Sequence, residues 1–188
     1  MPRLVVFNHV SVDGYFVDPK GDMSFAHGNR DDAEWNAFVA GNAAGGGVLL
    51  FGRVTYDLMR SYWPTPQALA RDPVVAERMN ARPKVVFSRT LDAATWANTR
   101  LVKSDVAAEV RRMKRESGSD MAILGSGTIV SQLAATGLID EFQIVVNPVV
   151  LGGGRTMFDG VRERLALRLT RTRAFANGSV LLCYHPTA

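Results

Sequence analysis

The sequence predicts an α/β fold built on one mixed, mostly parallel sheet. Short apolar runs, typical of buried strands, alternate with segments of helical periodicity along most of the chain. The end of the chain differs, because two strand-like segments, 165–175 and 180–184, flank the turn pair Asn177 and Gly178, which is typical of an antiparallel hairpin. With 188 residues, 47% of them apolar and 21% charged, one domain spanning residues 1–188 around one core is expected.

The first half of the chain is predicted to alternate strands with helices. The predicted elements are a strand over 4–7, a helix that opens with an acidic first turn at 31–34, a buried strand over 48–51 and a helix over 55–61. Glycines at 45–47 end the first helix, and residues 18–30, rich in Asp, Gly and Asn, form a loop. Four prolines between 63 and 83 predict an irregular stretch with a short helix over 75–80.

The second half is predicted to continue this pattern. Strands are expected over 84–88, 99–102, 121–124 and 142–150. Ser104 caps a helix that stops at Gly118, and a second helix follows the glycine-rich loop at 125–128 and ends at Gly137. Pro148 lies within the last of these strands, so this strand is expected to lie at an edge or to contain a bulge.

Three of the predicted strand ends carry residues suited to bind an anion. Gly52 leaves one strand and is followed by Arg53 and Thr55 at a helix start, where free backbone amides and the helix dipole attract negative charge. The other two junctions are Ser88 with Arg89, and the loop of Gly125, Ser126, Gly127 and Thr128. Because the carboxyl ends of parallel strands meet at one edge of a sheet, we expect the three junctions to form one site.

Each junction also has a plainer explanation. The first is equally consistent with a capped helix that bears a solvated arginine, and the second, taken alone, is more simply a turn. The glycine loop is not the complete dinucleotide fingerprint, because Val130 replaces its last glycine. A Walker loop is excluded, since no Gly-Lys-Ser/Thr sequence occurs.

Taken in order, the motifs resemble those of a known family. They are Ser-Val-Asp-Gly at 11–14, Gly-Arg-Val-Thr-Tyr at 52–56, Ser-Arg at 88–89, Gly-Ser-Gly-Thr at 125–128, Gly-Leu-Ile-Asp-Glu at 137–141 and Asn-Pro-Val-Val-Leu-Gly-Gly-Gly at 147–154. The motifs at 52–56, 88–89 and 125–128 resemble the cofactor side of dihydrofolate reductase. The whole set is more similar to the reductase domain of the bifunctional riboflavin-biosynthesis deaminase-reductases and to stand-alone members of that group. The resemblance implies a dihydrofolate-reductase-like three-layer fold and an NADPH-dependent reductase of a small, heterocyclic substrate.

The resemblance also implies roles for individual residues. The pyrophosphate and the 2′-phosphate side of NADPH are assigned to Gly52, Arg53 and Thr55, and the 2′-phosphate is flanked by Ser88 and Arg89. The pyrophosphate is cradled by Gly125, Ser126, Gly127 and Thr128, and the nicotinamide lies near Val12 and Gly14. The residues themselves agree, because two arginine-bearing junctions favour NADP over NAD.

Asp13 is the candidate catalytic residue, since it lies at the mouth of the expected site and could donate or orient a proton. A plain Asp-Gly turn explains it equally well. The early-helix acids Asp31, Asp32 and Glu34 are better explained by helix capping than by catalysis. The chain lacks the residues of a zinc deaminase. The NADPH-dependent reductase has three alternatives. They are a riboflavin-pathway 5-amino-6-(5-phosphoribosylamino)uracil reductase, a dihydrofolate reductase proper and a non-catalytic NADP(H)-binding module.

Composition narrows the remaining function classes. The net charge of +4 comes with no nucleic-acid-binding motif, and one cysteine and three scattered histidines argue against a metal site or a disulfide framework. We find no signal peptide and no apolar stretch of the ~20 residues that a membrane span needs, so a cytoplasmic protein is expected. A homodimer is expected from the family, supported by the apolar stretch 144–151 as a candidate exposed edge.

Overall fold

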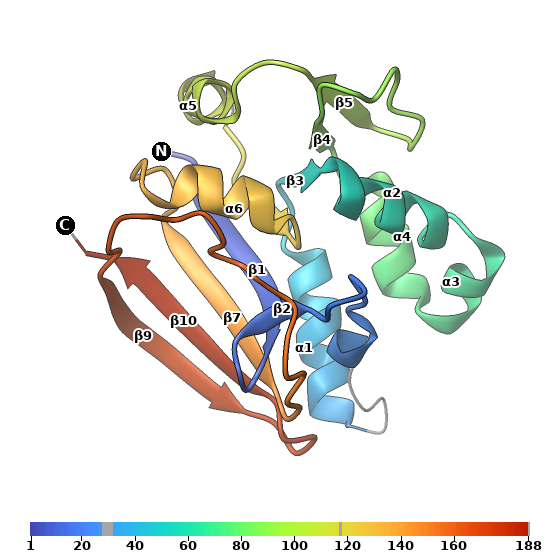
Figure 1. The fold of residues 1–188 in the computed structure, drawn as a ribbon. Helices are drawn as coiled ribbons and strands as arrows, with labels where there is room; N and C mark the ends of the chain where they lie inside the picture. The colour runs from blue at the N-terminus through green and yellow to red at the C-terminus, as the bar shows by residue number, and fades with distance from the viewer. Residues whose placement is uncertain (28–31, 117, 188) are drawn as a thin grey trace.

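An eight-stranded sheet forms the centre of the molecule in the computed structural model, which describes residues 1–27, 32–116 and 118–187 (Figure 1). The strand order is β5-β4-β3-β6-β1-β7-β10-β9. The bounds are β1 Leu4–Ser11, β3 Val48–Gly52, β4 Lys84–Phe87, β5 Thr99–Val102, β6 Met121–Leu124, β7 Glu141–Asn147, β9 Leu167–Ala174 and β10 Val180–Pro186. Strands β5 to β7 in this order pair in parallel, and β10 and β9 are antiparallel. The predicted mixed sheet with a C-terminal hairpin is confirmed.

Helices cover the sheet on both faces and give the predicted three layers (Figure 1). They are α1 Ala33–Ala44, α2 Arg53–Tyr62, α3 Pro66–Arg71, α4 Pro73–Ala81, α5 Val106–Glu116 and α6 Gly127–Ala134, with a 3₁₀ turn at Ser24–His27. Alternate residues of each strand point to opposite faces. In β3, Leu50 packs with α5 and α6, whereas Leu49 packs with α2 and α4. Trp35 of α1 packs on Val145 of β7 and Leu181 of β10.

Local capping explains where several helices begin. Asp32 caps α1, because its carboxylate accepts a hydrogen bond from the Trp35 amide at 2.9 Å. Asp31, the other half of the predicted acidic start, lies outside the described residues. The helix α5 is capped by Asp105, whose carboxylate accepts from the Ala108 amide at 2.8 Å, and not by the neighbouring Ser104, as predicted.

The proline-rich stretch was predicted in part: the short helix expected over 75–80 lies within α4, but the rest of the stretch is less irregular than expected. Residues 63–83 contain two helices, α3 and α4, each of which has a proline in its first turn. Proline is compatible with this position because the first helical amides have no partner within the helix. The Thr65 hydroxyl caps α3 by accepting from the Ala68 amide at 3.2 Å. These prolines therefore start helices rather than interrupt them.

Three further expectations need correction. β7 ends at Asn147, before Pro148, and pairs with β1 on one side and β10 on the other, so the stretch 144–151 is not an exposed edge. The exposed edge on this side is β9. The helix α6 ends at Ala134, three residues before Gly137. The hairpin turn holds one residue more than the Asn-Gly pair, since Phe175 pairs with Ser179 and Gly178 adopts φ +86°.

A small two-stranded sheet lies beside the main one and ties two long loops together. β2, Tyr15–Val17, pairs antiparallel with β8, Arg155–Thr156. A Cβ on Gly154 would lie 1.9 Å from the carbonyl oxygen of Val17, so only glycine permits this close approach. The loop after β1 and the loop after β7 are thereby held as one unit next to the carboxyl ends of both strands.

Candidate functional site

The three predicted junctions lie at one edge of the sheet. They follow β4, β3 and β6, which are adjacent and parallel, and β1 and β7 come next in the same direction. In register, Gly52 lies opposite Phe87, which precedes Ser88, and Leu124, which precedes Gly125, lies opposite Phe7. The topology therefore brings Arg53, Ser88 and Gly125 to neighbouring positions, as expected for open α/β sheets.

Two helices begin side by side at this edge, one on each face of the sheet. The cap residues of α2 and α6 are joined directly, because the Gly52 amide donates to the Ser126 hydroxyl at 3.0 Å. The Ser126 amide donates in turn to the Thr55 hydroxyl at 3.0 Å. The positive ends of two helix dipoles thus meet at one point, which is a favourable place for negative charge.

The backbone at this point adopts an uncommon conformation. Gly125 and Ser126 both lie in the left-handed region, with φ of +60° and +57°. A Cβ on Gly125 would lie 2.9 Å from the Thr55 methyl group, so steric space as well as φ requires glycine here. Non-glycine residues in this region cost free energy and cluster at functional sites. The conformation of Ser126 is therefore a second sign of function at this loop.

The joined helix starts present first-turn backbone amides. The cap Gly52 offers no side-chain hydrogen bond to α2, and the first amide of α6 with a backbone partner is that of Ile129. The first amides of a helix have no partner within the helix, which applies here to Val54 of α2 and to Gly127 and Thr128 of α6. Such amides are satisfied by water or by a ligand.

Not all predicted ligands remain free to bind. The hydroxyls of Thr55 and Ser126 are used inside the site, since Ser126 Oγ also donates to the Leu124 carbonyl at 3.0 Å. Ser88 is used similarly, because its hydroxyl accepts from the Leu91 amide at 3.0 Å. These three side chains shape the loops of the site.

The two arginines belong to adjacent loops. Arg53 Nη1 donates to the Thr90 hydroxyl, one residue beyond Arg89, and Arg53 Nε lies 3.5 Å from the Asp57 carboxylate. The Arg53 side chain is 46% exposed, and Arg89 is exposed as well. The start of α2 and the loop after β4 are thereby linked, with both guanidinium groups accessible to a ligand.

Asp13 fastens two loops to each other. Its carboxylate accepts from the Ser11 hydroxyl at 2.6 Å and from the amides of Leu151 and Gly152 at 3.1 and 2.8 Å. The Ser11 hydroxyl, opposed by burial and helped by these amides, lowers the pKa of Asp13 below its ordinary value. These contacts give Asp13 a structural function, and its part in proton transfer stays a prediction.

Exposed apolar side chains surround the same edge. Val12 after β1, Val54 after β3 and Val150 after β7 are 62%, 76% and 68% exposed. Leu58, one turn further along α2 than Val54, is 48% exposed. Gly14, with φ +85°, turns the chain directly after Val12. Only Val12 and Gly14 were predicted; the other apolar positions could have been found as valines that directly follow strand-end motifs.

Asn8 is a site residue that the sequence analysis missed. It is 2% exposed, and its side-chain amide donates to the Gly125 carbonyl at 3.0 Å and contacts Met157 Sδ at 3.0 Å. Its Oδ1 is buried without a hydrogen-bond partner in the described structure. Asn8 holds the glycine loop to β1. A lone asparagine inside the apolar run of β1 was the available signal.

The early-helix acids have structural partners. The Asp32 carboxylate accepts from the Trp35 amide and from the Asn177 amide at 3.0 Å, and these bonds outweigh burial and lower its pKa. Glu34 forms an ion pair with Arg173. Within the described residues, no group of three His, Cys, Asp or Glu side chains could hold a metal ion, and no helix is long and apolar enough to cross a membrane.

A hollow of about 510 Å³ lies elsewhere, at the opposite edge of the sheet. It is formed by the segment after α6, the segment before β9 and the end of β10; its charged and imidazole-bearing lining residues are Asp140, Glu163, Arg164, Arg168 and His185. The size of this hollow does not make it the site. The left-handed conformation of Ser126, the joined starts of α2 and α6 and the exposed arginines all lie at the carboxyl edge.

The fold and the carboxyl-edge site together define a protein of the dihydrofolate-reductase-like α/β class. Residues 2–181 match the model of the RibD C-terminal domain family, and the chain belongs to that family. Two Bacillus subtilis proteins of uncharacterised function are similar in sequence. YwjB is 33% identical over 176 residues, 92% of each chain, and YyaP is 30% identical over 138 residues, 73% of each chain.

Solved structures share the fold. A putative riboflavin biosynthesis protein from Shewanella sp. PV-4 superposes with a TM-score of 0.77 at 21% identity and covers 99% of both chains. A pyrimidine reductase-like protein from Corynebacterium diphtheriae has a TM-score of 0.67 at 11% identity, covering 100% of this chain and 92% of that one. The bifunctional deaminase/reductase of Thermotoga maritima has a TM-score of 0.69 at 14% identity, and the match spans 57% of its length.

Proposed function

We propose that the protein is an NADPH-dependent reductase whose cofactor pyrophosphate binds where α2 and α6 begin. The observation that carries this proposal is the hydrogen bond between the cap residues Gly52 and Ser126, which joins two helix N-termini. A diphosphate has two anionic groups, and the joined helices offer two sets of first-turn amides that have no partner within their helices. The absence of a Cβ at Gly125 and Gly127 lets the loop pack closely on Thr55, Phe16 and Met157, which fixes its amides in place.

The arginines are assigned to the adenosine end. Arg53 and Arg89 stand on neighbouring loops, and a guanidinium binds phosphate in a bidentate manner. A 2′-phosphate held between them accounts for a preference for NADPH over NADH. Ser88 supports this end indirectly, because its hydroxyl holds the turn that carries Arg89.

The nicotinamide end is assigned to the loop after β1. When bound, NADPH supplies a hydride, and the protein supplies position and the exclusion of water. Asp13 holds the loop of Val12 and Gly14 against residues 151–152, and the exposed valines around it offer an apolar surface to a flat ring. A small heterocyclic substrate, of the pyrimidine type that the names of the structural neighbours indicate, fits this surface. The proton that completes the reduction of the substrate comes from water or from Asp13.

Titration of the protein with NADPH, followed by ligand fluorescence or calorimetry, tests the proposal. We expect saturable binding near about 1 μM, and weaker binding of NADH. Replacing Arg53 with Ala should weaken NADPH binding by about 10- to 100-fold and NADH binding much less, because only NADPH carries the 2′-phosphate. Arg111→Ala, an exposed arginine on α5, is the matched control and should bind like the wild type. No saturable binding of NADPH to the wild type would reject the proposal.

A non-catalytic NADP(H)-binding module is the second candidate. The observation that favours it is the full engagement of the Asp13 carboxylate by three donors, which leaves no free acid there. This version predicts cofactor binding without oxidation of NADPH across a broad substrate screen. Turnover of the riboflavin-pathway pyrimidine would instead identify a reductase of that pathway, and turnover of dihydrofolate would identify a dihydrofolate reductase. A cytoplasmic location and a homodimer stay predictions of this proposal.

A further inference from the structure

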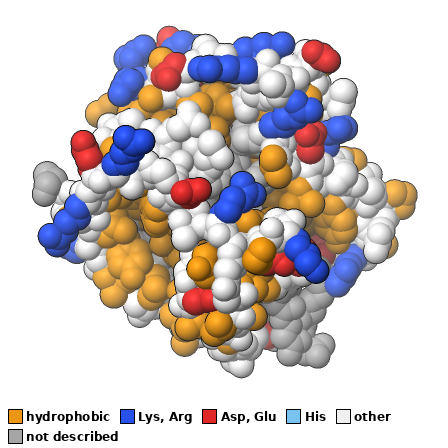
Figure 2. Space-filling model, viewed as in Figure 1, with side chains coloured by type: hydrophobic (Ala, Val, Ile, Leu, Met, Phe, Trp, Pro, Cys, Tyr) orange, Lys and Arg blue, Asp and Glu red, His pale blue; other side chains and the backbone are white. Residues whose placement is uncertain are grey.

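Two arginines share one carboxylate at the adenosine end of the candidate site. Arg53, Asp57 and Arg60 follow each other on α2 at intervals of four and three residues, so they lie along one stripe of the helix. One oxygen of Asp57 lies 3.5 Å from Arg53 Nε, and the other lies 3.0 Å from Arg60 Nε. Figure 2 shows basic and acidic side chains next to each other in the region where Figure 1 draws α2. The arginine assigned to the 2′-phosphate therefore has an anionic neighbour.

The loop between β4 and β5 holds this stripe from the other side. The Thr90 hydroxyl accepts a hydrogen bond from Arg53, and the Thr95 hydroxyl accepts one from Arg60 at 3.3 Å. The buried Tyr56 hydroxyl fastens the same loop, because it accepts from the Thr95 amide at 2.9 Å. Arg53, its carboxylate neighbour and Arg60 are nevertheless 46%, 37% and 44% exposed. The three charges are thus arranged before a ligand arrives, and a ligand can reach them.

A carboxylate and an arginine favour different cofactors at such a position. In dinucleotide-binding folds, a carboxylate at the adenosine ribose accepts from the 2′-hydroxyl of NAD, whereas an arginine accommodates the 2′-phosphate of NADP. This chain offers both, with Arg53 and Arg89 as the cations and Asp57 as the anion. A phosphate bound to Arg53 is attracted by the guanidinium groups, and the carboxylate on the same guanidinium repels it.

We infer that Asp57 is a specificity-determining residue, whose negative charge weakens binding of the 2′-phosphate and narrows the preference for NADPH over NADH. This role rests on the NADPH site proposed above. A different role, in which Asp57 only holds Arg53 in position, requires an acceptor oxygen but no charge. Asparagine keeps the oxygen and removes the charge, so Asp57→Asn separates the two roles. The side chain is partly exposed, and the substitution is compatible with the fold.

Titration of the wild type and of Asp57→Asn with NADPH and NADH, at about 50 mM salt, tests this role. The variant should bind NADPH about 3- to 10-fold more tightly, with a clearly smaller change for NADH, because only NADPH carries the repelled phosphate. At about 0.5 M salt the gain should fall below about twofold, since salt screens exposed charges. Glu163→Gln removes one exposed carboxylate at the opposite edge of the sheet, and this matched control should bind both cofactors like the wild type.

The outcomes separate the role of Asp57 from the proposed reductase. If the wild type binds NADPH but Asp57→Asn binds it equally or more weakly, the specificity role is overturned and the reductase proposal stands. Equal tightening for NADPH and NADH also overturns it, because the discrimination is then unchanged. Adenosine 2′,5′-bisphosphate and adenosine 5′-monophosphate measure the same discrimination without a nicotinamide. A wild type that binds neither NADPH nor the bisphosphate rejects both proposals, whereas one that binds only the bisphosphate, more tightly in Asp57→Asn, supports the role of Asp57 alone.

Discussion

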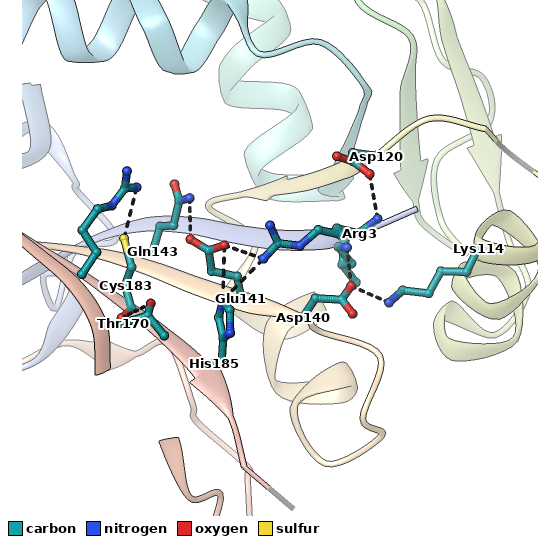
Figure 3. A network of polar contacts seen from close by, with 11 residues as sticks. Arg3, Lys114, Asp120, Asp140, Glu141, Gln143, Thr170, Cys183 and His185 are labelled. Carbon is teal, nitrogen blue, oxygen red and sulfur yellow. Dashed lines mark hydrogen bonds and ion pairs between the residues drawn. The ribbon is translucent and has the colours of Figure 1, made fainter. Parts of the chain in front are cut away.

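The two ends of the parallel strands differ in how completely their polar groups are paired. At the amino edge, Arg3 pairs with Glu141 at 2.7 Å and Lys114 with Asp140, while the amides of Arg3 and Leu4 bind the carboxylates of Asp120 and Asp140 (Figure 3). At the carboxyl edge, the first amides of α2 and α6 lack partners within their helices, arginines are exposed and two consecutive residues are left-handed. The same strands therefore end among paired charges at the amino edge and among exposed, ligand-accessible groups at the carboxyl edge.

This difference assigns different tasks to the two edges. Paired charges and satisfied amides hold the first strand to its neighbours, and they leave little to offer a ligand. Free amides and strained backbone lower stability, and they persist where a ligand uses them. Substitutions at the carboxyl edge should thus change cofactor affinity, whereas those at the amino edge should change stability alone.

The largest effect is expected for Gly125→Ala. The substitution forces a Cβ to within 2.9 Å of the Thr55 side chain at φ +60°. Left-handed strain and overpacking together should lower the free energy of unfolding by about 2–4 kcal/mol. Displacement of the start of α6 should also weaken NADPH binding at least about tenfold. Chemical denaturation and cofactor titration measure the two effects.

Gly41→Ala is the matched control. Gly41 lies within α1, and a Cβ there meets nothing within 4 Å. Alanine should stabilise the helix by up to about 1 kcal/mol and leave cofactor affinity unchanged. Equal effects of the two substitutions would show that the left-handed loop has no special importance and would remove the contrast between the edges.

The sequence was informative where chemistry depends on single residue types. Glycines at strand ends and the order of the motifs predicted which loops meet, because parallel strands must share a carboxyl edge. Ser126 and Thr55 show the limit of that approach. Both were expected to bind the cofactor, yet their hydroxyls bind each other's loops. A sequence shows that a hydroxyl is present, but only packing decides whether it faces a ligand or the backbone.

The fold was predicted less well where one residue type has two uses. Prolines end helices or begin them, and the stretch 63–83 uses them in the second way. The apolar run in β7 is central rather than at an edge, since a strand paired on both sides and an edge strand in an interface have similar composition. The two faces of the C-terminal hairpin could not be told apart from the sequence, because the register of β9 against β10 decides which residues share a face.

A smaller effect is expected for Glu141→Gln at the amino edge. Burial raises the pKa of Glu141, but the hydrogen bond from Gln143 and the charge of Arg3 outweigh it, so the pKa lies below its ordinary value of 4.5. The carboxylate therefore contributes stability above pH 4.5, and this contribution is lost as the pH falls below it. The variant should be less stable than the wild type by about 1–2 kcal/mol at pH 7.

The pH dependence supplies the control for that variant. The stability curves of wild type and variant should converge as the pH falls below 4.5, because protonation then removes the same ion pair from the wild type. NADPH affinity should be equal in both proteins. A constant stability difference at all pH values would indicate a packing defect, and a changed affinity would contradict the division between the edges.

The smallest effect on stability is expected for Asn8→Leu, which is the sharpest test of the comparison. Asn8 lies in the middle of the sheet, on the strand that links both edges, and its amide holds the Gly125 carbonyl. Leucine removes that bond but also removes a buried oxygen without a partner, so the free energy of unfolding should change by about 1 kcal/mol or less. NADPH affinity should still fall, by about 3- to 10-fold, because the carbonyl of the glycine loop is no longer fixed. Unchanged NADPH affinity would show that Asn8 contributes to the core alone. The loops at the carboxyl edge would then be positioned without support from β1.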